Sequence, residues 1–118
     1  MSKYDVKIES AYGVCESPLF QKMATKGDIQ ADKIEKMVDL VVNIKGWAKA
    51  HITTDEKEFD LYYYATDDGY FSSGSEYFNE GVVDYLVETE KFIIKKVKTK
   101  KGFTYKATPI VEDNNVKE

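Results

Sequence analysis

The sequence predicts a mainly β fold: a five-stranded Greek-key barrel with one helix between its third and fourth strands, preceded by an N-terminal extension. Three observations lead to this expectation. Apolar and polar residues alternate in several segments after residue 36, one helical stripe interrupts the alternation, and two turns that contain glycine separate neighbouring segments. The 118 residues suffice for one domain of this kind.

The first strand of the barrel is predicted to begin near Met37 and to bend at Gly46. Apolar residues occupy every second position at its start, namely Val38, Leu40, Val42 and Ile44. This period of two is typical of a half-buried strand, and a glycine inside a long strand is typical of a bulge or a bend. The outward side of this strand is expected to carry Asn43, Lys45, Trp47, Lys49 and His51.

The second strand is predicted at residues 59–66, and the third follows the turn Asp67-Asp68-Gly69. One face of the second strand carries Phe59, Leu61, Tyr63 and Ala65, and the other carries Asp60, Tyr62, Tyr64 and Thr66. A two-residue loop would set Phe71 on the polar face, whereas a three-residue loop turns it to the core. Burial of such a ring is worth about 2 kcal/mol, so we expect three residues. That choice sends Tyr70 outward, beside Tyr62 and Tyr64.

A helix is predicted next, because the period changes from two to that of a helical stripe. The stripe consists of Phe78, Val82, Tyr85 and Leu86. Ser73 and Glu76 have the spacing of a capping box, and Gly81 is a weak point inside the helix.

The last two strands are predicted at residues 91–99 and 103–110. The connection Lys100-Lys101-Gly102, taken as a three-residue loop, would pair Val97 with Tyr105 across the hairpin. The other face of the hairpin would then carry Lys96, Lys98 and Lys106.

The chain divides into an N-terminal extension (residues 1–35), the barrel (residues 36–111) and a frayed end (residues 112–118). The extension is weakly patterned. It predicts a short strand or hairpin that turns near Gly13, a break at Ser17-Pro18, and a short helix or loop near residues 28–36. We expect it to pack on the barrel or on a partner protomer.

The predicted elements follow the order of the OB-fold, which has three strands, then a helix, then two more strands. A β-grasp or another α+β domain shares several of these elements, but the bent first strand and the position of the helix favour the barrel. OB-folds hold single strands across their second and third strands, between two loops. The expected ligand is therefore an unpaired nucleic acid.

The charges are distributed unevenly along the chain. There are 17 basic residues, all lysine, against 21 acidic ones. Residues 91–106 contain seven lysines and no acid, while residues 55–90 contain one lysine and 11 acids. A basic strip of this kind can bind a polyanion despite the acidic total, although a solvated edge hairpin explains it equally well. Without arginine, bidentate recognition of guanine is not expected, which fits a binder that ignores sequence.

The expected site combines stacking rings with a cationic groove. Every base can stack on an aromatic ring, and lysines neutralise phosphates as point charges. The residues predicted to bind DNA are Lys45, Trp47, Lys49, Tyr62, Tyr64, Tyr70, Lys96, Lys98, Lys100, Lys101 and Lys106. The alternative is that the tyrosines reflect β-propensity and that Trp47 lies in a dimer interface.

Four segments carry a resemblance to a known family: Val38-Asp39-Leu40-Val41-Val42, Leu61-Tyr62-Tyr63-Tyr64, Gly69-Tyr70-Phe71-Ser72-Ser73-Gly74-Ser75 and Lys98-Thr99-Lys100-Lys101-Gly102-Phe103-Thr104-Tyr105. With them, residues 36–110 resemble small phage single-stranded DNA-binding proteins of the lactococcal siphophage early-region type. The resemblance implies an OB-fold and cooperative or dimeric binding of single-stranded DNA in phage replication or recombination. It also implies a homodimer in the host cytoplasm and contact with a recombinase or annealing protein. Residues 111–118 lack the acidic tail with an aromatic tip that bacterial single-stranded DNA-binding proteins carry.

Catalysis, a cofactor and a metal are not expected. The sequence contains no glycine-rich phosphate loop, zinc-ligand cluster or nucleophile elbow. Its single histidine, His51, argues against a His-rich metal site, and its single cysteine, Cys15, argues against an internal disulfide and for a reducing cytoplasm. The acids between Asp55 and Asp60 are better explained as the acidic end of a hairpin than as metal ligands.

A membrane or secreted protein is not expected either, because no apolar run has the length of a membrane span and no secretory signal is present. The alternative function is a phage-encoded acidic protein-interaction module, in which residues 55–90 bind a host or phage protein.

Overall fold

Strand β3 (Val41–Thr54) is the longest element of the structure, and the other strands assemble around it. The structure is a computed structural model, and it describes residues 4–111 of the chain. The remaining elements are β1 (Tyr4–Gly13), the 3-10 turn η1 (Val14–Glu16), α1 (Pro18–Thr25), β2 (Ala31–Lys33), the 3-10 turn η2 (Ile34–Met37), β4 (Glu58–Thr66), β5 (Gly69–Ser73), α2 (Glu76–Tyr85), β6 (Lys91–Thr99) and β7 (Gly102–Pro109). The fold is mainly β, as predicted, but residues 4–111 contain seven strands and two α-helices, where five strands and one helix were predicted for the barrel.

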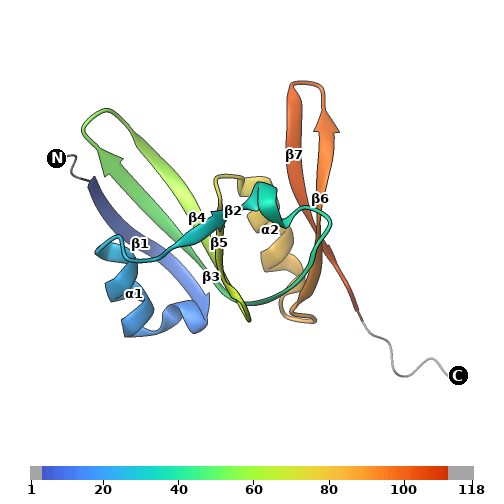
Figure 1. Cartoon of the computed structure of the whole chain (residues 1–118), viewed down its shortest axis with the longest axis horizontal. Helices are drawn as coiled ribbons and strands as arrows, with labels where there is room; N and C mark the ends of the chain where they lie inside the picture. Colours follow the sequence, from blue (N-terminus) through green and yellow to red (C-terminus); the bar gives the residue numbers. More distant parts are fainter. Residues whose placement is uncertain (1–3, 112–118) are drawn as a thin grey trace, which may run out of the picture.

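The strands form one curled, open sheet in the order β2-β5-β4-β3-β6-β7, with β1 also paired to β3. The start of β3 pairs with β6, where Val42 lies opposite Phe92. The rest of β3, from Gly46 onward, lies between β1 and β4. Figure 1 shows the result: the hairpin of β3 and β4 and the hairpin of β6 and β7 diverge from a common base.

The predicted bend at Gly46 is confirmed. The pairing of β3 with β4 shifts register between Ile44 and Gly46. Gly46 lies opposite Gly13 of β1, and a Cβ atom on either glycine would collide with the backbone of the other strand. The two glycines therefore allow a closer approach of β1 to β3 than any side chain would permit.

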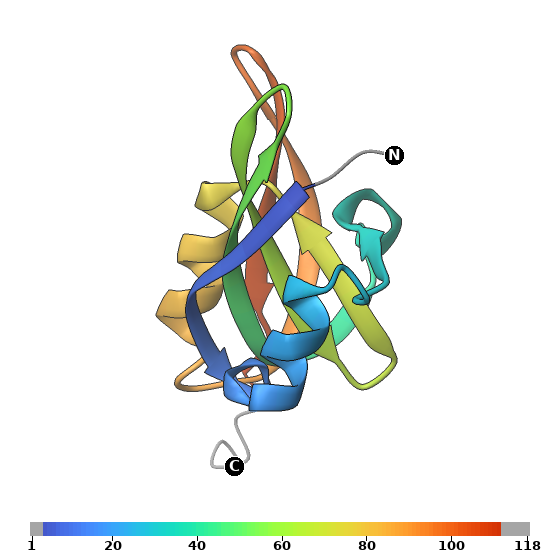
Figure 2. The same cartoon turned by 90° about the vertical axis from the view of Figure 1, so that its left-hand side faces the viewer.

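The apolar core has parts on both faces of the sheet. The larger part lies beneath α2, and its fully buried members are Ile44, Tyr64, Phe71, Phe78, Val82, Phe92 and Ile94. A smaller part joins α1 to β3 and β4, and its buried members are Cys15, Phe20, Ala24, Ala48 and Ala65. In Figure 2, α1 lies across the face of the sheet that is turned toward the viewer, and α2 lies to its left. Strand β4 is therefore covered on both faces.

Tyr62 and Tyr64 point into the larger core, so the predicted outward orientation is wrong. The Tyr64 ring is fully buried, stacks on Phe71 with 4.8 Å between ring centroids, and donates a hydrogen bond of 2.8 Å to Asn79 Oδ1. Phe71 is buried as predicted, but it lies one residue out of the predicted register, opposite Tyr64. The other face, that of Tyr63, is also covered by apolar side chains, so alternation alone did not identify the core face.

Both hairpin turns contain two residues instead of the predicted three. In the first, Thr66 pairs with Gly69. The Thr66 hydroxyl accepts a hydrogen bond from the Asp68 amide and donates one to the Gly69 carbonyl, which closes the turn without an added bulge.

In the second hairpin turn, Thr99 pairs with Gly102. The φ angle of Gly102 is 144°, a conformation that favours glycine. Because this turn is one residue shorter than predicted, Val97 lies opposite Thr104 and not opposite Tyr105.

Helix α2 confirms the predicted stripe in part. Phe78 is buried as predicted, but Tyr85 is 45% exposed. The helix is capped by Ser75, whose Oγ accepts a hydrogen bond of 3.0 Å from the Phe78 amide. The predicted capping residue, Ser73, does not cap the helix. Its Oγ atom accepts a hydrogen bond from the amide of Ser75, the residue that caps the helix.

The described part of the N-terminal extension contributes strands β1 and β2 to the sheet. Strand β1 ends at Gly13, near the predicted turn, but the chain continues into η1 and not into a hairpin. The break at Ser17 is the start of α1: the Ser17 Oγ accepts a hydrogen bond of 3.0 Å from the Phe20 amide, and Pro18 occupies the first turn.

The segment predicted as a short helix or loop, residues 28–36, contains β2 and most of η2. Strand β2 pairs in parallel with β5, so it extends the curled sheet at one edge. The predicted frayed end, residues 112–118, lies outside the described residues.

Replacement of Tyr64 should destabilise the fold. Tyr64→Ala removes a fully buried ring and the partner of Asn79, so we expect the free energy of unfolding to fall by about 3–5 kcal/mol. Urea denaturation measures this change. The matched control is Tyr77→Ala, because Tyr77 is 53% exposed on α2, and its effect should stay within about 0.5 kcal/mol. Equal decreases in the two variants would contradict the burial of Tyr64.

Candidate nucleic-acid interface

The hairpin of β6 and β7 projects from the sheet and carries most of the basic strip (Figure 1). We call residues 95–106 the basic arm. All its lysines are exposed, and they are Lys95, Lys96, Lys98, Lys100, Lys101 and Lys106. Lys95 forms an ion pair with Asp39 at 3.1 Å, whereas Lys98, Lys100 and Lys101 form none with another described residue. The tip of the arm therefore presents uncompensated positive charge.

The two faces of the arm differ in chemistry. Lys96 lies opposite Tyr105 and Lys98 opposite Phe103, so these two lysines and two rings share one face. Lys106 lies on the other face, and the prediction that it accompanies Lys96 and Lys98 is wrong. The shorter turn is the reason, because a shift of one residue moves one strand's side chains to the opposite face.

Phe103 is the functional candidate that the sequence analysis missed. Its side chain is 63% exposed, more than any other aromatic side chain that the structure describes. The Lys96 Nζ atom lies 4.2 Å from the centre of the Phe103 ring, a cation–π distance. A signal was present in the sequence, since Phe103 is the one ring among the lysines near the turn, but we assigned it only to a strand.

A cleft of about 570 Å³ separates the basic arm from the edge of β4 and β5. Its lining comes from four parts of the chain and consists of Lys33, Ile34 and Glu35, then Leu61, then residues 72–75, then Phe103, Thr104 and Tyr105. Apolar and aromatic side chains therefore face a serine-rich edge. Among the described residues that line it, Lys33 and Glu35 are the charged ones.

The predicted lysines on β3 are compensated by carboxylates. Lys45 Nζ lies 2.8 Å from Glu90 Oε1 and 3.7 Å from Asp67 Oδ1. The hydrogen bond to Glu90, and then the charge of Asp67, raise the pKa of Lys45. Lys49 Nζ lies 3.8 and 3.9 Å from carboxylate oxygens of Glu9 and Asp60. Neither lysine adds free positive charge to the cleft.

The predicted aromatic residues do not form one outward platform. Trp47 shares the face of Lys49 as predicted, but the register shift between Ile44 and Gly46 separates it from Lys45, and it is half-buried against the larger core, opposite Tyr64. Tyr70 is half-buried on the other face, with its ring centroid 5.7 Å from that of Phe20. With Tyr62 and Tyr64 in the core, Phe103 on the basic arm is the most exposed aromatic ring among the described residues.

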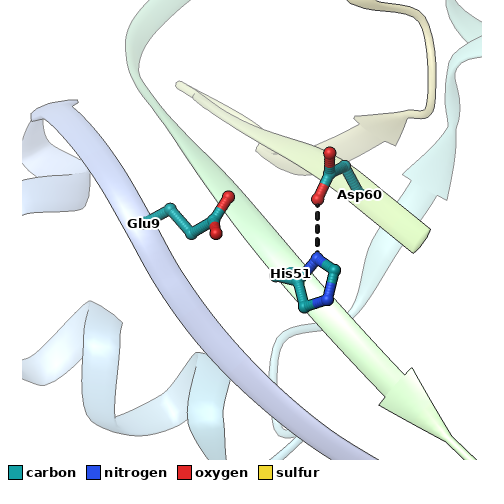
Figure 3. Close-up of side chains that lie close together, drawn as sticks. All are labelled: Glu9, His51 and Asp60. Atoms are coloured by element: carbon teal, nitrogen blue, oxygen red, sulfur yellow. Dashed lines mark hydrogen bonds and ion pairs between the residues drawn. The ribbon is translucent and has the colours of Figure 1, made fainter. Parts of the chain in front are cut away.

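A second polar group of side chains lies on β3 and β4, around His51. The Nδ1 atom of His51 is 2.9 Å from Asp60 Oδ1, and the Nε2 atom is 2.7 Å from Glu58 Oε1. The hydrogen bond to Asp60, and then that to Glu58, raise the pKa of His51 above its ordinary value. The carboxylate of Glu9, on β1, points toward His51 and Asp60 (Figure 3). Sequence analysis missed this group because Glu9 is remote from His51 along the chain.

The single cysteine is poorly suited to nucleophilic chemistry. The Cys15 side chain, in η1, is fully buried in the smaller part of the core, which joins α1 to β3 and β4. Burial raises the pKa of its thiol to about 12, so the reactive thiolate is scarce at neutral pH.

Comparisons of the chain with protein-family models, with curated proteins and with solved structures gave no match. Within residues 4–111, neither helix has the length and apolar character that a membrane crossing requires.

The pKa of His51 is directly measurable, because it is the chain's single histidine. In a metal-free buffer, proton NMR titration of its ring should give a value above the ordinary pKa of about 6.5. The hydrogen bonds of the charged ring should add to the free energy of unfolding in full at pH values below the pKa of His51 in the unfolded chain. This contribution should disappear as the pH rises through the pKa of His51 in the folded chain. Asp60→Asn should lower the measured pKa, and Glu56→Gln, on the same hairpin, should leave it unchanged. A wild-type value at or below 6.5 would rule out these hydrogen bonds.

Proposed function

We propose that this protein binds single-stranded DNA, without regard to sequence, in the cleft between the basic arm and the edge of β4 and β5. The observation that carries the proposal is the position of Phe103. Its ring is exposed at the cleft and shares one face of the arm with Lys96 and Lys98. A stacking ring beside cationic side chains is the combination that binds unpaired bases together with their phosphates.

The cleft offers different contacts to the two parts of a nucleotide. Bases would stack on Phe103 and lie against the half-buried ring of Tyr105 and the side chain of Leu61. Phosphates would meet Lys98 near the tip of the arm and Lys33 at the opposite wall. This arrangement places apolar contacts inside the cleft and charges at its borders.

The acidic residues of the neighbouring hairpin do not contradict binding in this cleft. Leu61 faces the cleft, whereas the alternating positions Glu58 and Asp60 face the other side of β4 and bind His51. Asp55 and Glu56 lie at the turn of that hairpin and would repel phosphates. The strand is therefore expected to follow the basic arm and to avoid the acidic hairpin.

Indifference to sequence follows from the chemistry of the contacts. A ring stacks on any base, and lysine binds a phosphate as a point charge. The chain contains no arginine, the residue most often used for bidentate recognition of guanine. DNA as the nucleic acid, and a role in phage replication or recombination, rest on the resemblance of residues 36–110 to small phage single-stranded DNA-binding proteins.

The proposal includes an OB-type arrangement for β3 to β7 and α2, with β1, α1 and β2 as additions to it. The order of these elements, the bend in β3 and the pairing of β3 with both β4 and β6 support it. By the same resemblance, the partners are a second copy of the chain and a recombinase or annealing protein, in the host cytoplasm.

Removal of the exposed ring should weaken binding and leave the fold intact. Phe103→Ala should lower the affinity for oligo-dT about 5- to 150-fold, which corresponds to the stacking of one base. Fluorescence anisotropy of a labelled oligonucleotide measures it. Tyr77→Ala is the matched control, because Tyr77 is an exposed ring on α2 outside the cleft. Unchanged affinity of Phe103→Ala would refute the site, and no binding by the wild type would favour the protein-interaction module.

Lysines at the tip of the arm should set the salt dependence of binding. The double variant Lys100→Gln/Lys101→Gln should reduce the slope of log affinity against log salt by about 0.7 for each phosphate that the two lysines neutralise in the wild type. Titrations at several salt concentrations measure the slope. Lys22→Gln/Lys26→Gln, which alters exposed lysines at the end of α1, serves as the control. Equal slopes for the wild type and the arm variant would exclude phosphate binding at the tip.

A further inference from the structure

One histidine and two carboxylates from three strands converge on the face of the sheet opposite α1 (Figure 3), and Glu58 of β4 adds a third carboxylate beside the histidine. We call Glu9 of β1, His51 of β3, and Glu58 and Asp60 of β4 the His51 cluster. One ligand atom from each of Glu9, His51 and Asp60 lies within 4.8 Å of the others. None of these four residues lines the cleft, so an inference from the cluster is independent of DNA binding.

We propose that Glu9, His51 and Asp60 bind a zinc ion. An imidazole nitrogen with two carboxylates suits zinc, whereas calcium and magnesium prefer sets made only of oxygen atoms. Three protein ligands leave the fourth position of a tetrahedral ion to water. The approach of His51 Nδ1 to Asp60 Oδ1, 2.9 Å, is close to the separation of two ligand atoms on one small ion.

Glu58 has the geometry of an orienting partner for a metal-binding histidine. Its Oε1 atom lies 2.7 Å from Nε2 of His51. A carboxylate that accepts the Nε2 proton fixes the ring and leaves Nδ1 directed at the ion. Binding of zinc at Nδ1 then replaces the proton that Nδ1 shares with Asp60, and that proton passes to solvent.

Lys49 is the cation that zinc must displace. Its ammonium group lies 3.8 Å from Glu9 and 3.9 Å from Asp60, between the two carboxylates that would become ligands. The lysine stem is flexible and its side chain is 32% exposed, so the ammonium group can move into water. Three carboxylates around the single ammonium group of Lys49 leave the cluster net negative whether or not His51 carries a proton, which favours a divalent ion.

A bound ion would link β1 to β3 and β4 through side chains. Strand β1 is otherwise joined to this hairpin by backbone pairing with β3 and by the small cluster of Val6, Ala50 and Ile52. Zinc would therefore raise the melting temperature of the whole chain, because an ion that binds only the folded state stabilises it by mass action.

Calorimetric titration of the whole, EDTA-stripped chain with zinc chloride tests the proposal. We expect one ion per chain. Glu9→Gln should weaken zinc binding at least tenfold, and Glu58→Gln should weaken it about 10- to 100-fold. Lys49→Met should tighten it, because the competing ammonium group is removed. Glu56→Gln, which removes an exposed acid of the same hairpin outside the cluster, should leave the affinity unchanged.

Absence of one-to-one zinc binding would overturn the proposal. Equal losses of zinc affinity in Glu9→Gln and Glu56→Gln would also overturn it, because they would indicate a general attraction of zinc to acidic residues. Lys49→Met without an increase in affinity would also count against it. If a substituted chain fails to fold, the wild type still decides the question. Proton NMR of the His51 ring must then change in proportion to added zinc and saturate at one equivalent, and an unchanged spectrum refutes the site.

Discussion

The close approach of β1 to β3 at the glycine pair Gly13 and Gly46 is the constraint on which the rest of the structure depends. No side chain fits at either position, because a Cβ atom would collide with the facing backbone. With this contact in place, β3 bends, and its pairing changes from β6 to β1 and β4. The bend separates the two hairpins, and their separation creates the cleft beside Phe103.

The bend also distributes charge and burial between the hairpins. The core beneath α2 joins their bases, and the bond from Tyr64 to Asn79 connects β4 to the helix through the interior. Beyond that core, the hairpin of β3 and β4 carries the acids and, together with Glu9 of β1, the His51 cluster, whereas the hairpin of β6 and β7 carries lysines and Phe103. Two chemically opposite surfaces therefore project from one shared base, and they are the basis of the two proposals, a polyanion bound on one side and a cation on the other.

Errors of one residue account for most differences between expectation and structure. Each turn was predicted one residue too long, and in a strand a shift of one residue exchanges the faces. That shift misplaced Lys106. It also gave Phe71 the wrong partner, although its burial was predicted correctly. Tyr62 and Tyr64 were assigned to the wrong face for a different reason, because α1 makes both faces of β4 apolar and removes the contrast that alternation depends on.

The sequence alone determined the mainly β class, the long strand with its bend at Gly46, the helix that contains Phe78, and the concentration of lysine in residues 91–106. These features are local: periodicity, glycine and charge act within a few residues of one another. Only the tertiary structure decided which face of β4 is buried, that Phe103 borders a cleft with Leu61, and that Glu9 meets His51 and Asp60. Those outcomes join residues distant in the chain, and no local pattern encodes which strands lie side by side in the curled sheet.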